Sequence, residues 1–166
     1  MKNLLLPVAF LVLFSACKKT NPSANDHLLG TWKQTAGTVK YYVKSTDRDT
    51  TVDYFKNLAS CYKDDLLTLK NEESGFITYG SESCDSTYPK TEKITWGTGY
   101  TNENGKSEKL LQITGGGWRY FHESSPYHLI VTGEVGNTFT VYYFSEGFES
   151  GADSKYLYYT NTYTRQ

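Results

Sequence analysis

Long apolar runs and an excess of charge of either sign are both missing from this chain of 166 residues. Its longest apolar run, residues 4–14, is too short to cross a bilayer, because a spanning helix needs about 20 residues. The 17 Lys and Arg residues nearly balance the 18 Asp and Glu residues, so the chain offers no large field to nucleic acid. We therefore expect neither a helical membrane-spanning protein nor a nucleic-acid-binding one.

Residues 1–16 have the layout of a secretory signal peptide, with Lys2 before the apolar run and small residues after it. A buried core helix is the weaker reading, because the run lies at the N-terminus behind a lysine. Ordinary signal peptidase needs small residues one and three positions before the cut. Ala16 meets the first demand and Phe14 does not meet the second.

The four residues Phe-Ser-Ala-Cys that end at Cys17 resemble a lipobox, the cleavage motif of bacterial lipoproteins. The resemblance implies that the mature chain begins at Cys17. It also implies a diacylglycerol thioether on this cysteine and usually a third acyl chain, such as palmitate, on its amine. Two or more acyl chains give stable anchoring, at about 0.8 kcal/mol per buried CH₂ group. We expect a membrane anchor that needs no transmembrane helix.

Residues 17–27 are expected to form the lipidated cysteine and a flexible polar tether, since they contain one proline and no apolar pair. Such tethers are similar to those of Bacteroidetes lipoproteins. Members displayed on the cell surface usually carry acidic residues after the cysteine, whereas Lys18 and Lys19 follow it here. The expected location is the outer membrane, with the domain facing the periplasm.

The remaining residues, 28–166, have the length of one domain. Aromatic residues make up 16% of the chain, with 15 tyrosines, and there are 14 glycines, a composition typical of β proteins. Tight-turn signals occur at Asn104-Gly105 and Gly136-Asn137, and the first places Trp96 opposite Ile113. Helical spacing predicts one or two helical turns within residues 53–60. Strands are expected at 32–43, 66–70, 75–79, 118–121, 128–135, 138–144 and 155–165. Two further strands flank the Asn104-Gly105 turn, of which one begins at 93 and the other extends to 113.

About eight strands joined by local connections predict an all-β fold, a single antiparallel up-and-down β-barrel with at most one short helix. Closing such a sheet removes its edges, and eight strands can enclose one small ligand.

The two cysteines not assigned to lipid, Cys61 and Cys84, flank a hairpin predicted over residues 66–79. With Lys70 opposite Gly75, Cys61 falls opposite Cys84. The envelope permits disulfides, and this one would contribute about 3 kcal/mol by loop closure. The alternative is two free thiols.

The motif Gly-Thr-Trp that ends at Trp32 resembles the entry signature of lipocalins. Together with the lipobox, the Cys-Tyr-Lys-Asp-Asp run from Cys61 and the second cysteine, it resembles the lipocalin-like domains of Bacteroidetes lipoproteins. The resemblance covers residues 28–166. It implies that Trp32 closes the barrel floor and that Arg165, on the last strand, packs over it in a cation–π contact within about 6 Å.

Side chains able to do chemistry do not form a recognisable constellation. His27, His122 and His128 lack metal-ligand spacing, and Asp64-Asp65 alternate across a strand, which favours a turn-capping or solvated role over calcium binding. No nucleophile or acid–base set appears, so neither an enzyme nor a cofactor is expected. Tyrosine-rich stretches either line a cavity or pack a core and coat an outer face. They lie at residues 41–42, 142–143 and 156–159.

Two functional classes remain. In the first, the barrel binds a small hydrophobic or amphipathic ligand through its mouth. In the second, a filled barrel is a structural lipoprotein or docks on a protein partner in the envelope. The filling of the interior by Trp96, Ile113, Leu129 and Val131 discriminates between them.

Overall fold

A computed structural model describes residues 27–71, 73–80, 89–103, 105–115, 127–146 and 156–166. The signal peptide, Cys17, the tether up to residue 26, and the strand expected at residues 118–121 lie outside these ranges.

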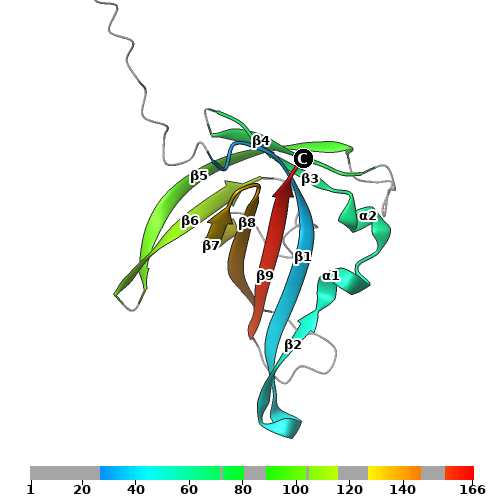
Figure 1. Cartoon of the computed structure of the whole chain (residues 1–166), viewed down its shortest axis with the longest axis vertical. Helices are drawn as coiled ribbons and strands as arrows, with labels where there is room; N and C mark the ends of the chain where they lie inside the picture. Colours follow the sequence, from blue (N-terminus) through cyan, green and yellow to red (C-terminus); the bar gives the residue numbers. More distant parts are fainter. Residues whose placement is uncertain (1–26, 72, 81–88, 104, 116–126, 147–155) are drawn as a thin grey trace, which may run out of the picture.

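Nine antiparallel strands form one sheet in the order β2-β1-β3-β4-β5-β6-β7-β8-β9 (Figure 1). Pairing of β1 with β9 closes all of them except β2 into an eight-stranded barrel, which confirms the predicted fold. The strands are β1 (Gly30–Val43), β2 (Arg48–Asp53), β3 (Leu66–Leu69), β4 (Ser74–Thr78), β5 (Thr91–Glu103), β6 (Lys106–Thr114), β7 (Tyr127–Val135), β8 (Thr138–Glu146) and β9 (Tyr156–Arg165). Three short helical segments accompany them: η1 (Lys44–Thr46), α1 (Tyr54–Asn57) and α2 (Ser60–Lys63).

The segment between β1 and β3 departs from a simple meander. β2, which the sequence did not predict, pairs with the far half of β1, whereas β3 pairs with its first four residues. Two one-turn helices, in place of at most one, then return the chain to the barrel. Asp53 begins the first of them by accepting a hydrogen bond from the Lys56 backbone N–H at 2.9 Å.

The β3–β4 hairpin differs from its predicted register by one residue. The Lys70 N–H donates to the Ser74 carbonyl at 2.8 Å, so that Leu69, not Lys70, faces Gly75. Glu73 takes a positive φ of 56°, which makes a tighter turn than the four residues expected. The one-residue shift matters because it sets Leu67 opposite Ile77 and points both into the core.

The β5–β6 hairpin has the predicted register, with Trp96 opposite Ile113. Gly105 and Gly136 supply positive φ values of 76° and 57° at the two tight turns. Because these turns need a left-handed residue, the glycines account for the local chain reversals.

A β-bulge in β1 changes which residues face inward. The register with β9 shifts between Gln34 and Ala36. Before the bulge, Trp32 and Gln34 are buried; after it, Val39 is buried on the opposite phase of the strand. A strand read as one unbroken alternation would place one of these halves on the wrong face.

Inward side chains from all eight barrel strands form one core. Its largest fully buried members are Trp32, Tyr127, Tyr163, Phe139, Leu28, Leu67, Leu69, Ile77, Leu111, Ile113 and Leu129. Aromatic rings contact edge to face or in stacks, as between Trp32 and Phe139 at 4.7 Å and Phe139 and Tyr163 at 4.9 Å.

Trp32 and Arg165 close one end of the barrel. They are opposite one another in the β1–β9 pairing, and the Arg165 guanidinium carbon lies 4.4 Å from the centre of the Trp32 ring. The predicted cation–π contact is therefore present. The guanidinium also donates to the carbonyls of Leu29 at 2.6 Å and His27 at 2.8 Å. Gly30 makes room, since a Cβ there would lie 2.7 Å from the Arg165 Nη1 atom.

Replacing Arg165 with methionine should lower the free energy of unfolding by about 2–3 kcal/mol, because the cation–π contact and two charge-assisted hydrogen bonds are lost. Urea unfolding of the variant and the parent protein measures this. Arg48→Met, at an exposed position on β2, is the matched control and should change stability by less than about 0.5 kcal/mol. Equal losses in the two variants would contradict a special role for Arg165.

Candidate functional site

The two ends of the barrel differ in their connections. Tight turns join β3 to β4, β5 to β6 and β7 to β8 at one end, which we call the floor end. At the opposite end, which we call the loop end, β4, β6 and β8 end and β5, β7 and β9 begin. Binding residues concentrate where loops gather on a rigid scaffold, so the loop end is the place to look for a site.

The interior along β5, β6 and β7 is apolar and packed. Trp96, Ile113 and Leu129 are buried there, and Val131 packs against the same core. The Trp96 indole N–H is also satisfied, because it donates to the carbonyls of Lys70 at 2.9 Å and Ser74 at 3.0 Å. This part of the barrel therefore has the side-chain filling that the structural hypothesis requires.

A chain of polar side chains lies on the side of the interior formed by β1, β8 and β9. We call Gln34, Tyr54, Tyr143 and Asn161 the tyrosine–amide cluster. The Gln34 amide donates to the Tyr54 hydroxyl at 2.9 Å, and this hydroxyl donates to Asn161 Oδ1 at 2.5 Å. Asn161 Nδ2 then donates to the Tyr143 hydroxyl at 3.5 Å, the longest link in the chain.

The bulged strand and a glycine bring this cluster together. Gln34 lies on one side of the β1 bulge and Gly37 on the other, where it is opposite Asn161. A Cβ on Gly37 would lie 2.7 Å from Gln34 Nε2 and 2.8 Å from the Tyr54 ring. Gly37 therefore leaves the space through which Tyr54, from α1, reaches the barrel interior.

Aromatic faces surround the polar chain. The Tyr159 ring stacks on the Tyr143 ring at 5.1 Å and meets the Tyr54 ring edge to face at 5.5 Å. Tyr142 and Tyr158 directly precede Tyr143 and Tyr159 in the chain, so their rings lie on the opposite face of the sheet. There they stack on each other at 6.0 Å. The tyrosine-rich stretches therefore serve both predicted purposes, one tyrosine of each pair pointing inward and one outward.

Burial dominates the titration of the cluster. It raises the pKa of Tyr54 above its ordinary value of 10.0, and hydrogen bonds with Gln34 and Asn161 lower it in part. Burial, with neighbouring tyrosines, raises the pKa of Tyr143 well above its ordinary value. Both phenols are therefore protonated at neutral pH and can donate as well as accept hydrogen bonds.

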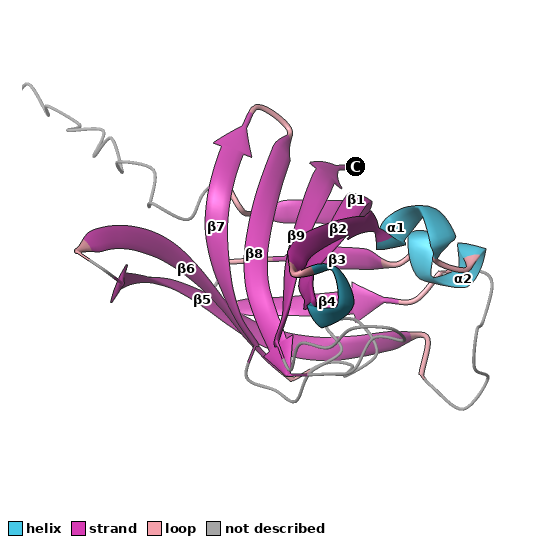
Figure 2. Ribbon diagram, turned by 90° about the horizontal axis from the view of Figure 1, so that it is seen from below, coloured by secondary structure: helices cyan, strands magenta, loops and turns pink. Residues whose placement is uncertain are grey.

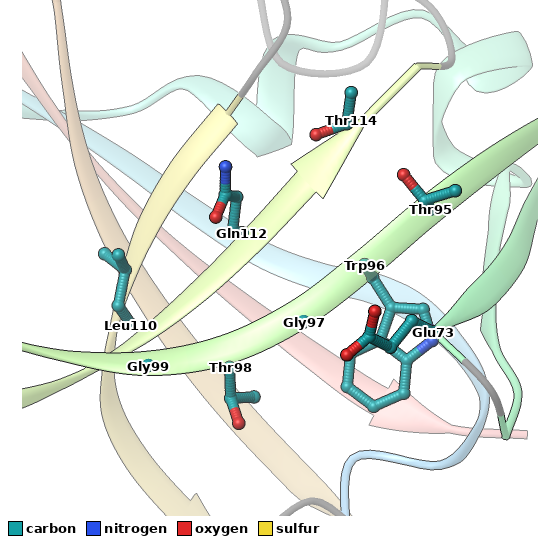
Figure 3. Close-up of a pocket in the computed structure, with 9 residues that line it drawn as sticks. All are labelled: Glu73, Thr95, Trp96, Gly97, Thr98, Gly99, Leu110, Gln112 and Thr114. Carbon is teal, nitrogen blue, oxygen red and sulfur yellow. The ribbon is translucent and has the colours of Figure 1, made fainter.

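A second feature is an open hollow of about 340 Å³ on β5 and β6 (Figure 3). Thr95, Gln112 and Thr114 project from the face of the sheet opposite to Trp96, so this hollow lies outside the core. It is lined by Glu73, Thr95, Trp96, Gly97, Thr98, Gly99, Leu110, Gln112 and Thr114.

The predicted cysteine pair is only partly within the described residues. Cys61 lies in α2, so it does not continue the β3 strand as the register argument assumed. Cys84, like Cys17, falls outside the described ranges. The Cys61–Cys84 disulfide therefore stays a prediction, while the argument from strand register is wrong.

The acidic pair takes a structural position. Asp65 is buried and accepts a hydrogen bond from the Gly80 N–H at 3.0 Å. The Asp64 carboxyl lies against Gly80, where an added Cβ would overlap it. Among the described residues, no group of three or more His, Cys, Asp or Glu side chains can hold a metal ion.

No protein-family model, curated protein sequence or solved structure matches the chain. In the part of the chain that the structure describes, no helix has the length and apolar character needed to cross a membrane. The tyrosine–amide cluster itself was not predicted. Two signals were available in the sequence: a glycine and a glutamine in an otherwise alternating strand, and an asparagine amid the tyrosines of the last strand.

Tyr54→Phe removes the hydroxyl that joins Gln34 to Asn161 and should cost about 1–2 kcal/mol at pH 7, since a buried amide loses its partner. The wild-type free energy of unfolding should fall as pH rises above about 10, because phenols ionise in the unfolded chain while the buried ones stay protonated. In Tyr54→Phe that fall should be shallower.

Urea titrations between pH 7 and 11 measure both effects. Tyr100→Phe, whose side chain is 71% exposed, is the control and should match the parent protein. An unchanged pH slope in Tyr54→Phe would contradict the assignment.

Proposed function

We propose that this chain is an envelope lipoprotein, anchored through Cys17, whose lipocalin-like barrel binds a small amphipathic ligand from the loop end. The observation that carries the proposal is the tyrosine–amide cluster, which sets hydrogen-bonding groups among aromatic faces above an apolar, closed floor. Binding sites for small molecules combine an apolar lining with a few convergent polar groups.

The longest hydrogen bond of the cluster, between Asn161 and Tyr143, marks the position at which we expect the ligand to bind. The Asn161 amide is buried and reaches the Tyr143 hydroxyl only at 3.5 Å, whereas the other links are 2.9 Å or shorter. A ligand carbonyl placed beside this pair, off the line that joins them, would accept hydrogen bonds from both the Asn161 amide and the Tyr143 hydroxyl. Its apolar part would then stack along Tyr159.

The second candidate is a non-catalytic structural or protein-interaction lipoprotein. It is favoured by exposed aromatic residues on β8, β9 and β1: Phe144 is 58% exposed, and Tyr158 and Tyr42 are each 39% exposed. Aromatic side chains at a surface are typical of protein interfaces. In this reading the interior cluster only holds the barrel together.

Native mass spectrometry of residues 18–166, after exposure to a broad set of lipids and sugars, should detect a bound amphipathic ligand. Asn161→Leu should weaken binding about tenfold or more, because a buried polar partner of the ligand is lost. Gln112→Leu alters the outer hollow instead and should leave affinity unchanged. A spectrum without ligand, or equal affinities in the parent and Asn161→Leu, would favour the structural candidate.

The anchor is tested by Cys17→Ala. The parent protein should sediment with membranes, whereas the variant should appear in the soluble envelope fraction, because no acyl chain can be attached. Cys61→Ala, which keeps the lipidation cysteine, should remain with the membranes. Retention of Cys17→Ala in the membrane fraction would rule out anchoring by this residue.

A further inference from the structure

Strand β5 continues well beyond the strand beside it. Its first five residues pair with β4, and the Trp96 N–H donates to the Glu73 carbonyl at 2.8 Å where β4 begins. Within the described residues, positions 97–103 pair with β6 alone. Both overall views show the β5–β6 hairpin projecting from the body of the barrel (Figures 1 and 2).

The direction of the backbone groups along this edge follows from Trp96. Peptide N–H and C=O groups alternate between the two sides of a strand. Because the Trp96 N–H points to the β4 side, those of Tyr100 and Asn102 point to the same side. The backbone N–H and C=O groups of Thr101, which lies between them, point towards β6. This is expected for a hairpin closed by the pair Glu103 and Lys106. Tyr100 and Asn102 thus present donors and acceptors to the open edge.

The two edges of the sheet are protected differently. β2, the edge strand at the other end of the strand order, has Arg48, Asp49 and Asp53 among its six residues. Charged side chains and short length are the usual means of keeping an edge from pairing with another chain. Residues 97–103 of β5 have the sequence Gly-Thr-Gly-Tyr-Thr-Asn-Glu, without lysine, arginine or proline. This edge therefore lacks the protection that β2 has.

We propose that the open edge of β5 pairs antiparallel with the same edge of a second copy of this chain, making a symmetric dimer. In the register with Tyr100 opposite its own counterpart, the two tyrosines exchange both backbone hydrogen bonds, as in a hydrogen-bonded antiparallel pair. A two-fold interface of this kind is self-complementary and closed.

The side chains suit this register. Glu103 falls opposite Gly97 of the other copy, so no like charges face one another. Tyr100, 71% exposed in the single chain, would lie beside its counterpart and lose that exposure. At Gly97 and Gly99 an added Cβ would meet nothing within 4 Å, so the face of the sheet is open at these positions. A second copy therefore pairs with this edge without setting like charges opposite one another.

Anchoring would favour the same dimer. His27, where the tether ends, has its Nε2 atom 3.3 Å from Lys109 Nζ, and Lys109 is opposite Tyr100 in the hairpin. Both His27 residues would then lie close to the two-fold axis. Strand pairing alone buries little surface, so the dimer should be weak in dilute solution and strengthened when both copies share one membrane.

The test is sedimentation equilibrium of the full mature chain in detergent over a range of protein concentrations. The parent protein should show a concentration-dependent dimer. Tyr100→Lys sets two like charges opposite each other and should weaken dimerisation about tenfold or more. Asn102→Pro removes a backbone donor on the open edge alone and should act in the same direction. Val135→Lys, at a position 77% exposed on another hairpin, should leave the dimer unchanged.

Circular dichroism of each variant establishes that the barrel is retained. If Tyr100→Lys does not fold, Asn102→Pro alone decides the comparison. A parent protein that stays monomeric at every concentration would overturn the proposal. So would a dimer that Asn102→Pro leaves intact, because the contact would then lie elsewhere. None of these outcomes depends on whether the barrel binds a ligand.

Discussion

Eight residue pairs join β1 to β9, from Trp32 with Arg165 to Lys40 with Tyr158, and the barrel exists because of this seam. Without it, the sheet would be a meander with two long edges and an exposed apolar face. The pairing brings together residues more than a hundred positions apart, so the first and last strands must meet before the core is sealed. The Trp32–Arg165 contact lies at one end of this seam, where it closes the floor.

The same seam positions the polar interior. The bulge after Gln34 reverses the facing of β1, which sets Gly37 opposite Asn161 and leaves room for Tyr54. The hydrogen-bonding side of the interior thus results from one irregularity in one strand. Buried polar groups cost free energy unless they are satisfied, and here the four side chains satisfy one another through hydrogen bonds.

Much of the fold could be predicted because the responsible signals are local. Gly105 at a tight turn set the β5–β6 register, and alternating aromatics marked the last strands. The errors also have local causes. A positive φ at Glu73 shortened one turn by a residue, and glutamate gives no sign of this. The tyrosine–amide cluster was missed because it depends on the β1 bulge and on contacts between distant strands, neither of which is visible in residue spacing.

Amide hydrogen exchange at the seam tests the central claim most directly. If the β1–β9 pairing closes the barrel, the amides that join these strands should exchange only through global unfolding, as slowly as those between β6 and β7. The projecting part of β5 should exchange much faster. Rapid exchange along β1 and β9, with protection kept between β5 and β8, would show a barrel that opens at the seam and would contradict the account.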